Sequence, residues 1–127
     1  MTIRVSLITP TYNERENVAP LAAEIFETLA GHPHIDLELI VVDDNSPDGT
    51  GQAAEALKDQ YPVQVIHRPG KLGLGSAVME GFARSERPYL GVIDADLSHD
   101  PVILPQLING LNESDITVGS RFGISSR

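Results

Sequence analysis

The sequence predicts an α/β domain in which a mostly parallel sheet carries helices on both faces. Short runs rich in valine, isoleucine and leucine alternate with longer stretches whose apolar residues recur every three or four positions. The alternation occurs four times and ends on a strand, which gives about five strands and four helices. The strands are apolar almost throughout, as parallel strands buried on both faces are. With 127 residues, the chain is long enough for one such domain and too short for two.

Five segments have the composition of strands. Each is short and apolar, and each is followed by turn residues or by proline. Pro10 ends the first of them, because proline has no N–H to donate to a neighbouring strand. The predicted strands cover residues 3–9, 37–42, 63–66, 89–93 and 115–119.

The first predicted helix is marked by an apolar stripe. Leu21, Ile25 and Leu29 lie four residues apart, so they share one face of a helix. Asn17 is a candidate N-cap and Gly31 a candidate end of this helix.

Three further helices follow. The second is weaker and runs through Ala53 to Leu57, and the third covers residues 76–84. Asp100 caps the fourth helix, whose first residue is Pro101, a position where the missing N–H of proline costs nothing. We assign Asp100 this capping role and no chemistry.

Composition excludes several classes of protein. The net charge of −9 argues against nucleic acid as the main partner, since phosphate backbones bind basic surfaces. The absence of cysteine excludes a disulfide framework, a thiolate metal site and a cysteine nucleophile. No apolar run approaches the roughly 20 residues that span a membrane, and the first residues lack the features of a signal peptide. We therefore expect a cytoplasmic chain without a transmembrane segment.

Unusual polar residues follow every predicted strand, whereas the opposite loops have ordinary turn composition. In a parallel α/β sheet, ligands bind at the carboxyl ends of the strands, so this pattern predicts a binding site along one edge. The five segments are "PTYNE" (10–14), "DDNSPDGT" (43–50), "HRPGKLGLG" (67–75), "DADLSHD" (94–100) and "GSR" (119–121).

Asp94 and Asp96 lie one residue apart directly after the fourth strand. Carboxylate oxygens are the ligands that a hard divalent cation prefers, and such a cation often keeps waters and shares its site with phosphates. The alternative is that Asp94 ends the strand while Asp96 is solvated. The further acids at a neighbouring strand end favour a metal site, for which Ser98 and His99 are candidate additional ligands.

Asp43 and Asp44 form a second acidic pair at a strand end. One interpretation is an Asx turn leading into the helix, which the "SPDG" signal favours for Asp48. The other is an acceptor for a base edge or a ribose hydroxyl, because adjacent like charges are costly unless a donor or a cation offsets them. The residues by themselves leave both interpretations open.

The glycine-rich "GKLGLG" (70–75) matches neither common phosphate-binding fingerprint. The dinucleotide pattern fails at Val78 and the Walker pattern fails at Val65, where each requires glycine. Lys71 is still a candidate to contact phosphate or to balance the acids, against the alternative of a flexible loop. Arg121 is similarly a candidate phosphate contact or a simple surface residue.

Taken together, these motifs resemble the nucleotide-binding half of the family 2 inverting glycosyltransferases, which have the GT-A fold. Within that family the sequence is most similar to the polyprenol-phosphate (dolichol-phosphate) mannosyltransferase group. The blocks "PTYNERENV", "VVDDNSPDGT", "GLGSA", "DADLSHDP" and "GSRF" carry the resemblance, which covers essentially the whole chain. It implies a Rossmann-like half of a GT-A enzyme, with residues 1–127 as a single nucleotide-sugar-binding domain.

The resemblance also implies roles for particular residues. Asp94, Asp96 and Arg121 would be catalytic, and Asp96 and Ser98 would approach a metal and the diphosphate. Many relatives carry glutamine at the position of Ser98, so a serine there would act through water. The residues that would bind the nucleotide sugar are Pro10, Tyr12, Glu14, Asp43, Asp44, Lys71, Asp94, Ala95 and Asp96.

The implied reaction transfers a sugar, mannose or glucose, from GDP-mannose or a UDP-sugar to a polyprenyl or dolichyl phosphate with inversion. The leaving nucleoside diphosphate is strongly negative, so Mg²⁺ or Mn²⁺ held by Asp96 would stabilise it as a Lewis acid. A lipid phosphate is already an anionic nucleophile and needs little help from a general base.

The resemblance further implies an acceptor-binding half beyond "GSR", whereas the sequence ends at Arg127. We therefore expect donor binding by this chain, at the cytoplasmic face of a membrane if it is peripheral there, and a homo-oligomer is compatible with the sequence. Two other hypotheses stay open: a non-catalytic nucleotide-sugar-binding or assembly domain, and a phosphoacceptor receiver domain. A receiver would need its aspartates after the first and third strands, whereas the acids here follow the second and fourth.

Overall fold

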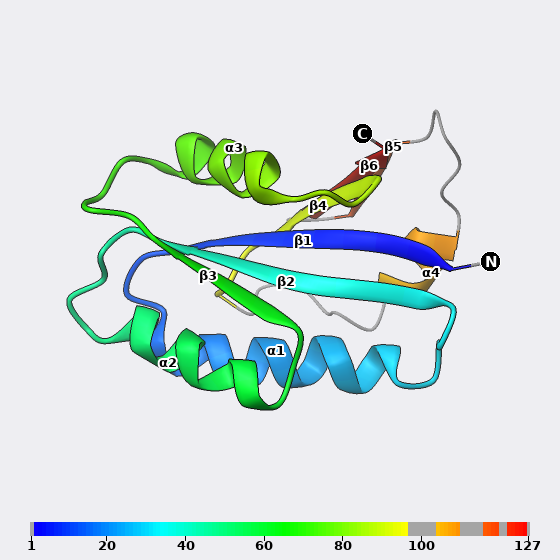
Figure 1. The fold of residues 1–127 in the computed structure, drawn as a ribbon, viewed down its shortest axis with the longest axis horizontal. Coiled ribbons are helices and arrows are strands. Elements are labelled where there is room, and N and C mark those ends of the chain that lie inside the picture. Colours follow the sequence, from blue (N-terminus) through cyan, green and yellow to red (C-terminus); the bar gives the residue numbers. More distant parts are fainter. Residues whose placement is uncertain (1, 97–103, 110–115, 120–121, 127) are drawn as a thin grey trace.

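The computed structural model describes residues 2–96, 104–109, 116–119 and 122–126. A six-stranded sheet with strand order β3-β2-β1-β4-β6-β5 forms the middle layer. Figure 1 shows α1 and α2 against one face of the sheet and α3 against the other. The strands are β1 (Ile3–Thr11), β2 (Ile35–Asp43), β3 (Val63–His67), β4 (Tyr89–Ile93), β5 (Ile116–Gly119) and β6 (Phe122–Ser126). The helices are α1 (Arg15–Leu29), α2 (Thr50–Ala56), the 3₁₀ helix η1 (Leu57–Asp59), α3 (Leu74–Arg84) and α4 (Leu104–Asn109).

The predicted α/β class with a mostly parallel sheet is confirmed. β1 pairs in parallel with β2 and with β4, and β2 pairs in parallel with β3. The register aligns Thr11 with Asp43 and Asp43 with His67, so the carboxyl ends of these strands lie side by side. The polar segments that follow the strands therefore start from one edge of the sheet.

The strand β6 lies beyond the five strands that the sequence predicts. It runs antiparallel to both β4 and β5 and separates them in the sheet. Its sequence, "FGISS", mixes two good strand formers with glycine and serine, so composition does not mark it as a strand. Pairing with one strand on each side, β4 and β5, stabilises the extended conformation that the local sequence does not favour by itself.

The prediction that the first strand stops before Pro10 is wrong, because β1 continues through Pro10 to Thr11. Pro10 pairs with Val42 of β2, whereas pairing with β4 has already ended at Ile8 and Val92. Beyond that point β1 has a neighbour on one side, and a residue without an N–H can be accommodated there. The two extra residues bring the strand to the edge of the candidate site.

The prediction of Asn17 as the N-cap of the first helix is also wrong. α1 begins at Arg15 with Glu14 as its N-cap, and Asn17 lies in the first turn, where its Nδ2 donates to Glu14 Oε2 at 2.7 Å. The predicted cap and first residue of the fourth helix, Asp100 and Pro101, lie outside the described residues. Of the helices that the structure describes, none combines the length and the apolar character needed to cross a membrane.

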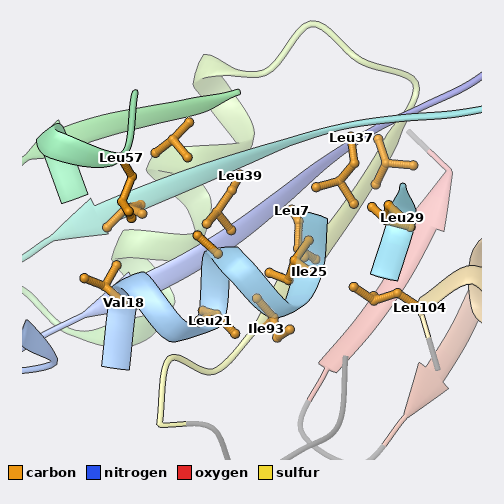
Figure 2. Packing of buried hydrophobic residues seen from close by; sticks show 14 of the residues in the cluster. Leu7, Val18, Leu21, Ile25, Leu29, Leu37, Leu39, Leu57, Ile93 and Leu104 are labelled. Atoms are coloured by element: carbon orange, nitrogen blue, oxygen red, sulfur yellow. The ribbon is translucent and has the colours of Figure 1, made fainter. Parts of the chain in front are cut away.

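Two apolar clusters hold the layers together. The larger one lies between the sheet and α1, where Leu7 and Leu39 of the sheet meet Leu21 and Ile25 of the helix (Figure 2). The smaller one lies under α3 and centres on Ile8, which is fully buried. These clusters fix the strands, so the loops at the carboxyl edge start from a rigid frame.

Candidate functional site

A pocket of about 410 Å³ opens at the carboxyl edge of the parallel strands. Among the described residues, its wall comes from three segments distant in sequence: the end of β1 with the loop after it, the loop between β3 and α3 with the start of that helix, and the residues directly after β4. Seven of its eight residues are ones that the sequence analysis assigns to nucleotide-sugar binding, and Leu74 is the eighth. The lining residues are Pro10, Tyr12, Glu14, Lys71, Leu74, Asp94, Ala95 and Asp96. That they bind a ligand stays a prediction.

The two aspartates of "DAD" both line this pocket. Asp94 directly follows β4 and is half-buried, whereas Asp96 is exposed. Ala95 between them is buried in the larger apolar cluster, which anchors the turn. Within the described part of the chain, no three His, Cys, Asp or Glu side chains gather as a metal cluster. Ser98 lies outside the described residues.

The loop that carries Tyr12 and Glu14 into the pocket is fastened to the loop after β2. Three consecutive backbone N–H groups of the first loop donate to side chains of the "DDNSPDGT" block. The pairs are Asn13 with Ser46 Oγ (3.0 Å), Glu14 with Thr50 Oγ1 (2.9 Å) and Arg15 with Asp48 Oδ2 (3.2 Å). These hydrogen bonds hold the backbone of the loop, and so fix the positions from which Tyr12 and Glu14 line the pocket.

The same contacts lower the pKa of Asp48. The hydroxyl of Thr50 donates to its carboxylate and, with the N–H of Arg15 and that of Thr50, holds the pKa of Asp48 below its usual value. The Asx-turn interpretation of Asp48 agrees with the N–H of Thr50 donating to Asp48 Oδ1 at 3.0 Å. The residue thus serves the loop, and it does not line the 410 Å³ pocket.

Asp43 is buried, and both oxygens of its carboxylate accept hydrogen bonds from the protein. Its Oδ1 accepts from the hydroxyls of Thr11 (2.7 Å) and Ser46 (2.6 Å), and its Oδ2 accepts from the N–H of Ser46 (3.0 Å). These bonds join the ends of β1 and β2 to the loop after β2. Asp43 is not among the lining residues, and the prediction that it also meets a nucleotide is untested.

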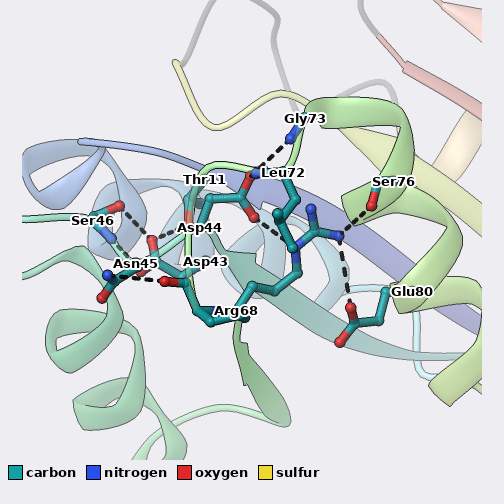
Figure 3. A network of polar contacts seen from close by, with 11 residues as sticks. Thr11, Asp43, Asp44, Asn45, Ser46, Arg68, Leu72, Gly73, Ser76 and Glu80 are labelled. Carbon is teal, nitrogen blue, oxygen red and sulfur yellow. Dashed lines mark hydrogen bonds and ion pairs between the residues drawn. The ribbon is translucent and has the colours of Figure 1, made fainter.

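Asp44 is likewise buried and points to the other side, toward the glycine-rich loop (Figure 3). Its Oδ2 accepts from the N–H groups of Leu72 (3.1 Å) and Gly73 (3.3 Å). Its Oδ1 lies 2.8 Å from Nε of Arg68, a residue that the sequence analysis left unassigned. The sequence does carry a signal for this pair, because Arg68 follows the third predicted strand and the acidic pair follows the second.

Lys71 extends from the glycine-rich loop to the pocket wall. Its Nζ lies 4.5 Å from the centroid of the Tyr12 ring, a cation–π arrangement. The pocket thus carries the carboxylates of Glu14, Asp94 and Asp96 and one ammonium group. Arg121, the other predicted cation of the site, lies outside the described residues.

The structure is an open α/β sheet with an acid-lined pocket at the carboxyl ends of its parallel strands, which is where such sheets bind their ligands. Residues 6–127 match the family described as Glycosyl transferase family 2. The chain therefore belongs to glycosyl transferase family 2.

Curated relatives narrow the similarity within that family. The chain is 46% identical over 121 residues to a dolichol-phosphate mannosyltransferase of Pyrococcus furiosus, covering 94% of this chain and 34% of the relative. It is 40% identical over 123 residues to the dolichol-phosphate mannosyltransferase of Saccharomyces cerevisiae, covering 96% of this chain and 46% of the relative. The chain therefore spans between a third and a half of the length of these enzymes.

A solved structure shows the same fold. The mannosyltransferase PcManGT from Pyrobaculum calidifontis, in complex with GDP-Man and Mn²⁺, superposes with a TM-score of 0.75 at 23% sequence identity. The match covers 91% of this chain and 35% of that one. The predicted GT-A architecture is thereby confirmed for the part of the chain that matches.

Proposed function

We propose that residues 1–127 form the donor-binding part of a glycosyltransferase that transfers mannose from GDP-mannose to a polyprenyl phosphate with inversion. The carrying observation is the pocket that gathers Tyr12, Lys71, Asp94 and Asp96 from three strand ends. Membership of family 2 supports the reaction class, and the two dolichol-phosphate mannosyltransferase relatives support the sugar and the lipid acceptor.

The residues present fit a hard divalent cation. Asp94 and Asp96 both line the pocket and Asp96 is exposed there, and carboxylate oxygens suit a hard cation that keeps waters and shares its site with a diphosphate. When bound, Mg²⁺ or Mn²⁺ supplies Lewis-acid stabilisation of the leaving diphosphate. We assign Asp96 as the direct ligand, with Ser98 as a further, water-mediated candidate. The solved PcManGT structure holds GDP-Man and Mn²⁺, which supports the proposal of a divalent cation beside the donor.

The other residues bind and orient the donor. Lys71 presents a cation at the pocket wall, where it can donate to phosphate oxygens. Tyr12 and Glu14 stand on the opposite loop, where the resemblance places the base and ribose. Arg121 is proposed as a second contact to the donor phosphate. An anionic lipid phosphate would attack the anomeric carbon from the opposite side without a strong general base.

A thermal-shift panel tests the proposal. GDP-, UDP- and dTDP-sugars would be added at millimolar concentration, each with and without Mn²⁺. A ligand that binds the folded state raises the melting temperature, so GDP-mannose with Mn²⁺ should give the largest rise. If no sugar nucleotide shifts the folded chain, with or without the cation, the donor site proposed here does not exist.

A matched pair of variants assigns the cation. Asp96→Asn should remove the Mn²⁺-dependent part of the shift, because it removes the exposed carboxylate at the pocket. Asp59→Asn removes one exposed acid from η1 and should leave the shift unchanged. Loss in both variants would point to net charge rather than to a ligand at Asp96.

A non-catalytic donor-binding or assembly domain is the second candidate, because the pocket that carries the proposal could hold a donor without transferring its sugar. Transfer of labelled mannose to a polyprenyl phosphate by the purified chain would exclude it. Donor binding without transfer would favour it. The third hypothesis, a phosphoacceptor receiver domain, is excluded because the chain belongs to glycosyl transferase family 2.

A further inference from the structure

Arg68 is buried although it carries a charge. It directly follows β3, and its side chain is 1% exposed. Its backbone N–H donates to the carbonyl oxygen of Asp43 at 2.8 Å, which continues the pairing of β2 with β3. A buried guanidinium group is unfavourable unless ion pairs and hydrogen bonds compensate its lost hydration. The groups that compensate this charge therefore indicate the structural role of Arg68.

The guanidinium joins the end of β2 to the first turns of α3 (Figure 3). Its Nε lies 2.8 Å from Asp44 Oδ1, as an ion pair whose alignment falls short of a hydrogen bond. Its Nη1 donates to Ser76 Oγ at 2.9 Å and lies 3.7 Å from Glu80 Oε1. Within the described residues Nη2 has no hydrogen-bond partner, so the side chain is held through Nε and Nη1.

The carboxylate that Arg68 holds also holds the loop between β3 and α3. The other oxygen of Asp44 accepts from the N–H groups of Leu72 (3.1 Å) and Gly73 (3.3 Å). At the start of the loop, Asn45 Nδ2 donates to the carbonyl oxygen of Pro69 at 3.3 Å. Both ends of the loop are thus fastened to the end of β2.

Lys71 lies between these fastened ends, and its own side chain is exposed. Its Nζ reaches the ring of Tyr12 and lines the pocket. We propose that Arg68 is a positioning residue for donor binding, which acts through Asp44 and this loop to hold Lys71 at the pocket wall. The role in binding rests on the proposed function, whereas the placement of Lys71 can be tested without a ligand.

Arginine suits this position better than lysine. Its planar group can serve Asp44 through one nitrogen and Ser76 through another, whereas lysine carries a single ammonium on a flexible stem. Arg68→Lys should therefore restore part of what Arg68→Met loses, because it keeps a counter-charge for the buried carboxylate and gives up the link to α3.

A double-mutant cycle on the full chain tests the mechanism. Titration calorimetry with GDP-mannose and Mn²⁺ should show about tenfold weaker binding for Arg68→Met and for Lys71→Ala, the expected scale for one charged hydrogen bond. If Arg68 acts through Lys71, the double variant should bind no more than about twofold weaker than Lys71→Ala. The proposal would be overturned if the double variant lost the product of the two single-variant losses in affinity. Unchanged binding in Arg68→Met would also overturn it.

A ligand-free measurement separates this proposal from the proposed function. In the wild type, the ring current of Tyr12 should shift the NMR signals of the ε-methylene protons of Lys71 upfield. This upfield shift should be lost in Arg68→Met and partly kept in Arg68→Lys. If the wild type binds no sugar nucleotide, the proposed function fails while this arm still decides the placement of Lys71. A shift that persists in Arg68→Met would overturn the positioning role.

Two further variants keep the test valid if Arg68→Met fails to fold. Arg84→Met removes an exposed arginine from the last turn of α3 and should change neither binding nor the Lys71 shift. Ser76→Ala removes the acceptor of Nη1 from an exposed position, and it should weaken binding about threefold in a folded chain. If Arg68→Met does not fold, an unchanged affinity in Ser76→Ala would overturn the proposal.

Discussion

The ammonium group of Lys71 lies over the aromatic ring of Tyr12, with Nζ 4.5 Å from the ring centroid. The two residues come from the loops that follow β3 and β1, so their contact joins two walls of the pocket. The Tyr12 side chain is partly exposed, and a cation–π pair in such a place is worth about 0.5–1 kcal/mol. The pair therefore organises the pocket more than it stabilises the fold.

Tyr12→Leu should weaken the binding of GDP-mannose with Mn²⁺ by about threefold to fivefold, because the aromatic face that holds Lys71 is removed. Tyr12→Phe keeps that face and should bind within about twofold of the wild type. Titration calorimetry on the folded variants measures both. Equal losses in the two variants would show that the hydroxyl, and not the ring, matters.

The aspartates at the site should separate into two groups by their effect on stability. Asp43→Ala leaves the buried hydroxyl of Thr11 and the partly buried donors of Ser46 without an acceptor, and it should lower the free energy of unfolding by about 2–3 kcal/mol. Asp96→Ala removes an exposed side chain, where even an ion pair contributes at most about 1 kcal/mol, and should lower it by no more than that. Urea denaturation measures both values. A similar cost for the two would contradict the assignment of Asp43 to the frame of the site.

The fold could be predicted because hydrophobic periodicity reports burial directly. The strand at residues 37–42 and the stripe of Leu21, Ile25 and Leu29 are local patterns, and each has the predicted place in the core. β6 could not be predicted in the same way. Its residues form a strand because β4 and β5 pair with them, and no local pattern in "FGISS" indicates that pairing.

The candidate site could be predicted as a set of strand ends but not as a set of side-chain directions. Asp43, Asp44 and Asp96 have the same chemistry and similar positions after strands, yet Asp43 and Asp44 are buried behind the pocket lining, whereas Asp96 is exposed and lines the pocket. Thr11 is the partner of Asp43 across 32 positions of sequence, and such contacts depend on how the loops close. Arg68 was missed for the same reason, since its partner Asp44 follows a different strand.

The close packing of α3 on the sheet should make Gly81→Ala destabilising. A Cβ atom at Gly81 would lie 2.6 Å from Cγ2 and 3.1 Å from Cγ1 of Ile8, which is fully buried and has a stiff branched side chain. Overpacking of this kind costs about 1–3 kcal/mol, which outweighs the gain of up to about 1 kcal/mol from replacing glycine in a helix.

The control lies in the same helix. A Cβ atom at Gly75 would meet nothing within 4 Å, so Gly75→Ala should be neutral or slightly stabilising. Thermal and urea unfolding of the two variants gives the comparison. A Gly81→Ala chain as stable as the wild type would show that α3 can move away from β1 at little cost.

The stability of the loop that carries Tyr12 should depend on pH through Asp48. The Thr50 hydroxyl, together with the N–H of Arg15, lowers the pKa of the Asp48 carboxyl below 3.8 in the folded chain. A depressed pKa means that the ionised form stabilises the folded state. This contribution is fully present above pH 3.8 and is lost as the pH falls through the folded pKa.

Asp48→Asn should therefore be less stable than the wild type near neutral pH, and the difference should shrink as the pH falls below 3.8. Urea denaturation at several pH values from about 7 down to about 3 measures the difference. Asp59→Asn, at the exposed end of η1, controls for the loss of one charge. A difference between Asp48→Asn and the wild type that stays constant across this range would mean that the amide disturbs the loop for another reason, and that ionised Asp48 does not hold it.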